Sequence, residues 1–301
     1  MTAQDSAIRH SAVAGPQERS GTALAALAVL SFSFSFPATT WTLADFGPWT
    51  SAGLRCALAG LLAAICLAAA RVPLPERRHW PGLLVVSAGC VLGFPLLTTL
   101  ALRTSSTAHS AVVIGVLPLA TAVAAVLRTG GRPSRRFWCA ALAGAAAVLA
   151  FTLLQSHGRP TVADLYLFAA LLVCAAGYAE GGRISRELPG WQVIAWAVVV
   201  ALPVTVLTAG IALSAEPVRL GAKAVAGLAY TAAVSQFGGF VLWYRGMAQI
   251  GVPRASQLQL AQPLLTLGWS VLLLGEGLPV AALVTALVVL VCIAVTQRAR
   301  A

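Results

Sequence analysis

The sequence predicts an all-α, polytopic membrane protein with ten transmembrane helices, arranged as two inverted five-helix repeats. Three observations predict this fold class: the hydrophobicity of the chain, a sequence pattern shared by its two halves, and a reversal of loop charge between them. Of the 301 residues, 59% are hydrophobic and only 10% are charged, and the mean hydropathy is +0.86. Soluble domains carry about 25% charged residues, so this composition excludes a water-soluble globular protein.

Ten segments contain enough apolar residues in sequence to cross a bilayer, for which roughly 18 are needed. They are, in order, residues 22–42, 49–70, 81–102, 105–127, 137–155, 162–184, 190–213, 221–243, 253–274 and 278–297. Residues 1–20 contain acids, Pro and Gln but no apolar core, so we expect a short disordered cytoplasmic tail and no signal peptide. The rest of the chain divides into the first repeat, the second repeat and a cytoplasmic C-terminus, predicted at 21–155, 156–297 and 298–301.

The two halves share a sequence pattern at an offset of 145 residues, which aligns residues 110–131 with residues 255–276. Leu and Val matches between apolar helices arise by chance, so the matches of Pro, Thr and Gly carry the comparison. These are Pro118 with Pro263, Thr121 with Thr266, and Gly130 with Gly275. Because each repeat has an odd number of spans, the second copy must cross the bilayer in the opposite direction. Inverted repeats of this kind build many secondary transporters.

Basic residues distinguish the two faces of the membrane. Most of the twenty Lys and Arg residues fall on the face that both termini share, so the positive-inside rule predicts that both termini are cytoplasmic. The loop after the fourth predicted span reads RTGGRPSRR, whereas its counterpart after the ninth reads GEGLPVA and has no basic residue. This reversal favours inverted over parallel copies. It also explains the net charge of +11 without a nucleic-acid partner.

Four segments of the chain are typical of a known family: GLRCALAGLL (53–62), TSSTAHSAVVIGVLPLATAVAAVL (104–127), GYAEGGRISREL (177–188) and FVLWYRGMAQIGVPRASQLQLAQPLLTLGWSVLLLGEGL (240–278). In these segments the chain resembles the EamA-type permeases of the drug/metabolite transporter (DMT) superfamily, and the resemblance extends over residues 21–297. It implies a secondary transporter of small metabolites. Bacterial relatives often export amino acids or related amphipathic compounds, so efflux is the implied direction. The scarcity of Lys relative to Arg suggests a high-GC genome and hence a bacterial inner membrane.

Two segments depart from the family pattern. The family often has a Gly-Glu pair after the fourth span, where this chain has Gly130 and Gly131. Many members begin the first span with Trp followed by Asn, where this chain has SFSFSFPATTW at 31–41. Because substrate contacts are often placed in that helix, the resemblance does not carry substrate specificity to this chain.

Polar side chains within the predicted spans mark the expected substrate cavity, because in hydrocarbon they are costly unless they face protein or water. In the ninth predicted span, hydroxyl and amide side chains recur at three- and four-residue steps and so share one helix face: Ser256, Gln259, Gln262, Thr266 and Ser270. The other cavity candidates are Ser31, Ser35, Arg55, His109, Tyr178, Tyr230, Gln236 and Trp243. The alternatives are hydrogen bonding or packing between helices for the polar residues and anchoring at the membrane interface for Trp243. Pro37, Pro118 and Pro263 are predicted helix breaks, since each removes a backbone hydrogen bond.

The charged residues within the spans have two interpretations each. The favoured interpretation of Arg55 is that its long side chain snorkels to the headgroups or has a structural role, and the alternative is that its guanidinium binds a substrate carboxylate. His109 and Glu180 are candidates for coupling transport to protons, since histidine titrates near neutral pH. The alternatives are a packed histidine and an intrahelical pair between Glu180 and Arg183. Glu276 is expected in a turn or at the start of the tenth span.

No catalytic residue, metal site or cofactor is predicted. The six cysteines fall within spans without metal-ligand spacing, and His10, His79, His109 and His157 are scattered without an HExxH motif. The small residues of the fifth span and the polar-free tenth span suit scaffold packing or a homodimer contact. The expected partners are the lipid bilayer, a small-molecule substrate and protons. A channel or a non-transporting membrane partner is the alternative function, and an intramembrane enzyme is the least favoured.

Overall fold

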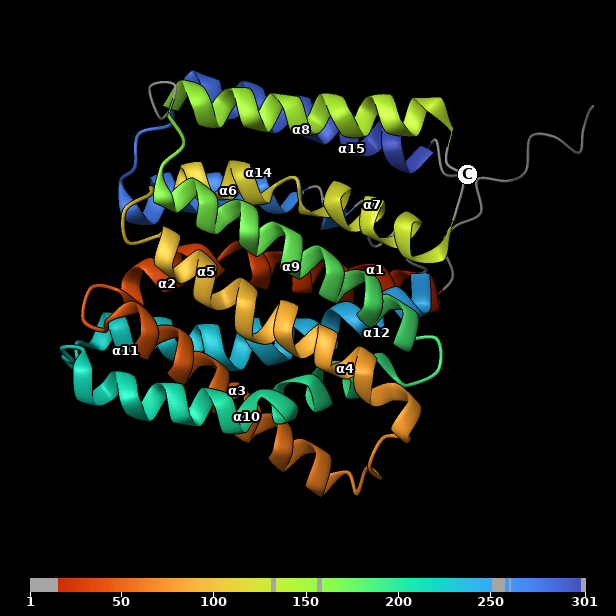
Figure 1. Cartoon of the computed structure of the whole chain (residues 1–301), viewed down its shortest axis with the longest axis vertical. Helices are drawn as coiled ribbons and strands as arrows, with labels where there is room; N and C mark the ends of the chain where they lie inside the picture. Colours follow the sequence, from red (N-terminus) through yellow and green to blue (C-terminus); the bar gives the residue numbers. More distant parts are fainter. Residues whose placement is uncertain (1–15, 131–133, 156–158, 251–257, 260, 299–301) are drawn as a thin grey trace, which may run out of the picture.

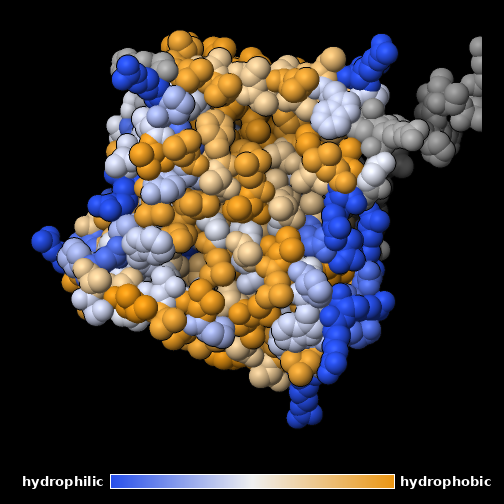
Figure 2. Space-filling model, in the orientation of Figure 1, coloured by the Kyte–Doolittle hydropathy of each residue, from blue (hydrophilic) through white to orange (hydrophobic). Residues whose placement is uncertain are grey.

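Long apolar helices run side by side through the computed structural model of the chain (Figure 1). The structure describes residues 16–130, 134–155, 159–250, 258–259 and 261–298. Eight helical segments are long and apolar enough to cross a membrane, and Ala261–Leu274 and Val280–Val295 are shorter apolar helices. A broad hydrophobic band lies between two edges that carry the hydrophilic side chains (Figure 2). The chain is therefore a multi-pass membrane protein, and the count of ten spans stays a prediction.

The first half of the chain contains the first five predicted spans. Its elements are α1 (Pro16–Ser33), α2 (Ser35–Thr42), α3 (Pro48–Ala69), the short 3-10 helix η1 (Arg77–His79), α4 (Trp80–Val86), the π-helix η2 (Ser87–Gly93), α5 (Phe94–Ala101), α6 (Thr107–Ile114), α7 (Leu117–Thr129) and α8 (Arg135–Gln155). The second half contains α9 (Val162–Ile184), α10 (Gly190–Ala215), α11 (Ala222–Ala229), the π-helix η3 (Tyr230–Gly239), α12 (Phe240–Ile250), α14 (Ala261–Leu274) and α15 (Val280–Arg298).

The predicted disordered tail at residues 1–20 is too long. Helix α1 begins at Pro16, because proline suits the first helical position, where its missing N–H would have no partner anyway. Residues 1–15 lie outside the described part of the chain. At the other end α15 extends to Arg298, one residue into the predicted C-terminal segment.

The breaks within spans precede the prolines. The first span is interrupted at Phe34, so Pro37 lies in the first turn of α2 and not at the break itself. The fourth span is interrupted at Gly115 and Val116, directly before α7, whose second residue is Pro118. Pro263 lies near the start of α14 as described, but residue 260, directly before that helix, lies outside the described residues, so no break is placed there. A proline is tolerated in the first turn of a helix and disfavours helix in the residue before it, which explains this order.

Two backbone features recur at the 145-residue offset. The π-helix η2, shifted by that offset, falls within the π-helix η3. Gly130 and Gly275, which follow α7 and α14, both have a φ of +68°, the left-handed conformation in which glycine commonly ends helices. The repeat seen in the sequence is therefore also present in local backbone geometry.

Helices of the two halves pack against each other throughout the molecule. Helix α3 lies along α10, α1 along α12, and α9 against both α5 and α7. Helices α8 and α15 pack together along one edge, at the top of Figure 1. Small residues permit the closest approaches: a Cβ added at Gly53 would lie 3.0 Å from the backbone of Ala209. The packed core is consequently shared between the halves.

Candidate functional site

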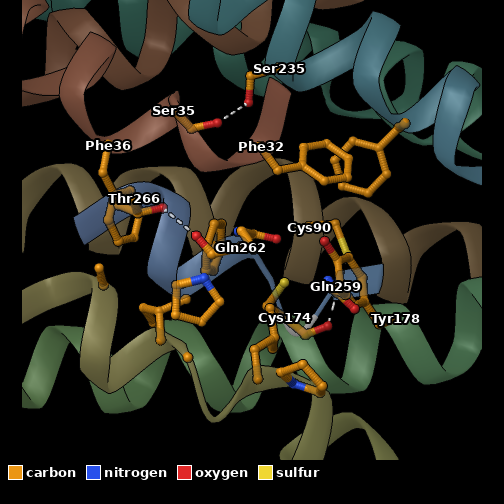
Figure 3. A pocket seen from close by; sticks show the side chains of 18 of the residues that line it. Phe32, Ser35, Phe36, Cys90, Cys174, Tyr178, Ser235, Gln259, Gln262 and Thr266 are labelled. Carbon is orange, nitrogen blue, oxygen red and sulfur yellow. Dashed lines mark hydrogen bonds between the residues drawn. The ribbon is translucent and has the colours of Figure 1, made fainter. Parts of the chain in front are cut away.

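A pocket lies in the middle of the helix bundle, between the two halves of the chain (Figure 3). Its lining comes from the first, second, third, fourth, sixth, eighth and ninth predicted spans. Helices α8, α10 and α15 contribute no lining residue that the structure describes. The cavity volume is about 60 Å³, which is room for a few water molecules. The fifth and tenth spans therefore pack outside the site, as expected for peripheral scaffold helices.

Aromatic side chains form the apolar wall of the pocket. Phe32 and Phe36 are one turn apart and both reach the pocket, Phe32 from the end of α1 and Phe36 from α2. The rings of Phe32 and Phe240 are 5.0 Å apart between centroids, and those of Tyr178 and Phe240 are 6.0 Å apart. The sequence had suggested only Tyr178 among these rings, because a phenylalanine within an apolar span carries no signal that separates a pocket from packing.

Hydroxyl, amide and guanidinium groups form a polar patch in the same lining. The Ser35 and Ser235 hydroxyl oxygens are 2.6 Å apart, which joins the first span to η3 (Figure 3). Arg55 Nε donates to Gln236 Oε1 at 3.1 Å, and Arg55 Nη2 donates to the Ser235 hydroxyl at 3.4 Å. Gln259 and Gln262 add two amides from the ninth span. The patch therefore combines residues about 200 positions apart in the chain.

The two π-helices help to build this patch. A π-helix disturbs the regular pattern of backbone bonds, and such segments are frequent at functional sites. In η2 the Cys90 carbonyl accepts a hydrogen bond from Gln236 Nε2 at 3.2 Å, and the Val91 carbonyl accepts one from the Cys56 thiol at 2.9 Å. Thus η2 and η3 are tied together across the pocket by a side chain of η3.

Arg55 is the one charged residue in the pocket lining as far as the structure describes it. Its position contradicts the snorkelling interpretation. Only 7% of the residue is exposed, and its guanidinium binds Gln236 and Ser235 of η3, so it is directed into the protein and not toward headgroups. The hydroxyl and amide partners hold the guanidinium toward the bundle interior, which a hydropathy pattern does not reveal.

Of the predicted cavity residues, Ser35, Arg55, Tyr178, Gln236, Gln259 and Gln262 line this pocket, as do Pro118 and Pro263. Ser256 lies outside the described residues. Ser235 and Thr266, polar residues of the eighth and ninth predicted spans, line the pocket as well. The pocket also includes Phe32, Phe36, Cys90, Phe94, Cys174 and Phe240, which the site prediction did not contain. The spacing of Phe32, Ser35 and Phe36 on one helical face was the available signal for two of them.

Four predicted cavity residues have other neighbours and lie outside the pocket. Ser31 donates to the Ala28 carbonyl, and its own carbonyl accepts from the Tyr230 hydroxyl at 2.9 Å. Trp243 is buried with its ring edge-on to Phe32, so it is neither a pocket residue nor an interfacial anchor. His109 Nε2 lies 2.7 Å from Asp164 Oδ1. Its ring stacks on Phe151, which agrees with a packed histidine at a helix end.

Carboxylates join the halves of the chain near both ends of the helices. Glu276 accepts from the backbone N–H groups of Thr107 and Ala108, both at 2.8 Å, and so caps α6 and not the tenth span. Glu180 accepts from Arg183 Nη2 at 2.7 Å, which is the expected intrahelical pair, and also from Arg128 Nε of α7 at 3.2 Å. No group of three His, Cys, Asp or Glu side chains suited to a metal ion occurs among the residues described.

Comparison with known proteins gives three findings. The EamA-like transporter family matches the chain twice, over residues 19–153 and 161–297. The uncharacterized transporter YdeK of Bacillus subtilis (strain 168) is 42% identical over 272 residues, which cover 90% of this chain and 95% of that protein. A solved structure titled "Crystal structure of protein" aligns with a TM-score of 0.63 at 20% identity, covering 94% of this chain and 98% of that one. At that identity the solved structure supports the fold alone.

Proposed function

The chain belongs to the EamA-like transporter family, and from this premise we propose that it is a secondary active transporter of small amphipathic metabolites. The membrane-transporter role follows from the family itself. The observation that carries the finer proposal is the central pocket, which both halves of the chain line with an aromatic wall and a polar patch. We further propose efflux of amino acids or related compounds across a bacterial inner membrane, with both termini cytoplasmic.

Alternating access between inverted repeats suits the packing of the halves. The contacts of α3 with α10 and of α8 with α15 pair equivalent spans, and the contact of α1 with α12 has its equivalent in that of α9 with the third span. The same helix contacts thus recur when the first and second halves trade places, and this symmetry supports an inverted duplication. A cavity of about 60 Å³ is far smaller than the several hundred Å³ that ligand sites usually need, so substrate entry requires the helices around it to separate.

Alternating access requires that two sets of contacts between the halves, one at each face of the membrane and each called a seam here, open in turn. On the face that carries few basic residues, Glu276 of the second half binds the N-terminus of α6, and Glu216 binds that of α3 through Thr50 N at 2.8 Å. On the arginine-rich face, Arg128 binds Glu180 and His79 binds Glu187, again across the two halves. Each seam thus consists of contacts that a relative movement of the halves would break and remake.

We assign proton coupling to the pair of His109 and Asp164 in preference to Glu180. Two guanidinium groups bind Glu180, and both favour its ionised form. His109 of the first half meets Asp164 of the second half at 2.7 Å, so protonation of the pair would change a contact between halves.

Flux measurements in proteoliposomes test the proposal. Saturable flux of radiolabelled amino acids that responds to a proton gradient is the expected result, and Gln259→Ala in the pocket should lower it several-fold. The matched control is Gln192→Ala in α10, which lies outside the pocket lining and should leave flux unchanged. Unitary conductance in planar bilayers would identify a channel instead, and absence of flux across a broad metabolite library would contradict the transporter proposal.

A further inference from the structure

We propose that Arg55 binds a carboxylate of the transported compound, so that the pocket selects amphipathic carboxylates and rejects amphipathic cations. This inference rests on the proposed transport function and names the substrate class of the same pocket.

The first argument is the unbalanced charge of Arg55. A guanidinium remains protonated in proteins, and an ionised side chain within a membrane span costs about 2.5–3.5 kcal/mol unless it is paired or faces water. The chain has nine Asp and Glu residues, and none whose side chain the structure describes pairs with Arg55. Those near the spans are engaged elsewhere, for example Asp164 with His109 and Glu180 with Arg183. The positive charge in the pocket lining thus has no counter-charge among the described residues.

The second argument is the geometry of the guanidinium. Neutral acceptors on η3 bind Nε and Nη2, so the plane of the group is held in place before a ligand arrives. Within the described part of the chain, Nη1 has no hydrogen-bond partner. A guanidinium has five N–H donors in a planar fork, and a carboxylate matches two of them at once. The side chain therefore has both the charge and the free donors that carboxylate binding requires.

The rest of the lining agrees with an amphipathic anion. Phe32, Phe36 and Phe240 provide apolar surface for the body of the ligand. Pro118 and Pro263 have no N–H to offer the carbonyls four residues before them, those of Ile114 and Gln259, and both of these residues line the pocket. A carbonyl oxygen that receives no bond from the proline can accept one from an ammonium group, but it offers that group only a partial negative charge. Zwitterionic amino acids are thus compatible with the pocket, whereas a cation without a carboxylate would meet the charge of Arg55 unopposed.

Three probes that share a phenyl ring separate these charges: 3-phenylpropionate, L-phenylalanine and 2-phenylethylamine. Thermal-shift titrations of the purified full chain should show stabilisation by the two carboxylates and none by the amine. Arg55→Gln should weaken carboxylate binding about 10- to 100-fold, the loss expected for a hydrogen bond to a charged group. Arg55→Lys keeps the positive charge but loses the planar guanidinium, so its affinity for carboxylates should lie between those of the unmodified protein and Arg55→Gln. Arg103→Gln, which removes an exposed guanidinium outside this pocket, is the matched control.

The outcomes separate this inference from the proposed function. Stabilisation of the unmodified protein by the amine but not by the carboxylates would overturn the inference, and this comparison does not depend on any variant folding. Unchanged carboxylate affinity in a monodisperse Arg55→Gln protein would overturn it too. In both cases saturable flux of another compound would leave the transporter proposal standing, whereas absence of all flux would contradict that proposal alone.

Discussion

Gln236 determines how Arg55 is presented to the pocket. It is 1% exposed, accepts from Arg55 Nε and donates to the Cys90 carbonyl, so it holds the guanidinium and η2 at the same time. These two bonds use both ends of a single amide. At the scale of the residue, the role of Arg55 therefore depends on a partner 181 positions later in the chain.

Gln236→Glu tests this arrangement with a nearly isosteric change. The carboxylate at position 236 would lie about 3 Å from Arg55 Nε and form an ion pair with it. We expect the protein to remain folded. Carboxylate ligands should bind at least tenfold more weakly, because the new carboxylate at position 236 already pairs with the guanidinium of Arg55. Thermal-shift titration with 3-phenylpropionate measures both quantities. Retained affinity together with an unchanged melting temperature would contradict this role for the pair.

Glu187 gives a pH-dependent contact at the arginine-rich face. A hydrogen bond from His79, at 3.0 Å, together with the nearby charges of Arg78 and His79, lowers the pKa of the Glu187 carboxyl. A carboxyl whose pKa is lower in the folded state stabilises the fold above its unfolded pKa, and this stabilisation is lost as the pH falls through the folded pKa. The stabilisation is therefore lost as the pH falls below the ordinary glutamate pKa of about 4.3.

Glu187→Gln should flatten this part of the pH profile. The apparent melting temperature of the variant in detergent should fall less than that of the unmodified protein as the pH is lowered through about 4.3. Glu76→Gln, at a more exposed carboxyl on the same face, is the control and should leave the profile nearly unchanged. Identical profiles for Glu187→Gln and the unmodified protein would contradict the contribution of the contact with His79.

At the scale of elements, the third and eighth spans depend on irregular helix. The positions of these spans and the prolines inside spans follow from hydropathy and from the backbone chemistry of proline. The π-helices η2 and η3 could not be predicted, because neither SAGCVLG nor YTAAVSQFGG has a local pattern that separates a π-helix from an α-helix. Their irregularity is supported by contacts across the pocket, such as that of Gln236 with Cys90, which belong to tertiary structure.

The crossing of the third and sixth spans requires glycine. A Cβ added at Gly89 of η2 would collide with the backbone carbonyl of Val173 in α9. Gly89→Ala should therefore destabilise the protein by about 1–3 kcal/mol, the usual cost of overpacking. Gly210→Ala in α10 is the matched control, because nothing lies within 4 Å of its added Cβ. The control should be neutral or stabilising by up to about 1 kcal/mol, since alanine favours helix over glycine. Equal melting temperatures for both variants would contradict this crossing.

At the scale of the whole molecule, the sequence predicts best which segments and polar residues lie within the membrane. It predicts least well which side of each helix faces the pocket. Arg55, Gln259 and Pro263 were recognisable as cavity candidates because polar groups and helix breaks are costly in lipid. His109 and Trp243 were selected by the same criterion but pack outside the pocket. The free-energy cost of a polar group in lipid does not indicate which neighbouring residue it contacts. Pairings such as Ser35 with Ser235 require the relative depth of spans far apart in the chain.

Inverted topology predicts that equivalent loops lie on opposite sides of the membrane. In a background without the native cysteines, Arg136→Cys after the fourth span should react only with reagent on the cytoplasmic side. Gly277→Cys, after the ninth span, should react only from the opposite side. Both positions are exposed in the structure. Labelling of intact cells with a membrane-impermeant maleimide measures this, and reaction of both positions from the same side would exclude inversion.

On the proposed alternating-access cycle, the guanidinium of Arg55 in the pocket would also make transport sensitive to voltage. Under alternating access the electric field falls across whichever seam is closed, so Arg55 is near the potential of the side to which the pocket opens. A membrane potential of 100 mV acts on one elementary charge with about 2.3 kcal/mol. A bound carboxylate that has no ammonium group would cancel this charge, so with such a ligand the field would act on the empty carrier and not on the loaded one. A potential that is negative inside would hold the empty pocket open to the cytoplasm, where an exporter collects its cargo.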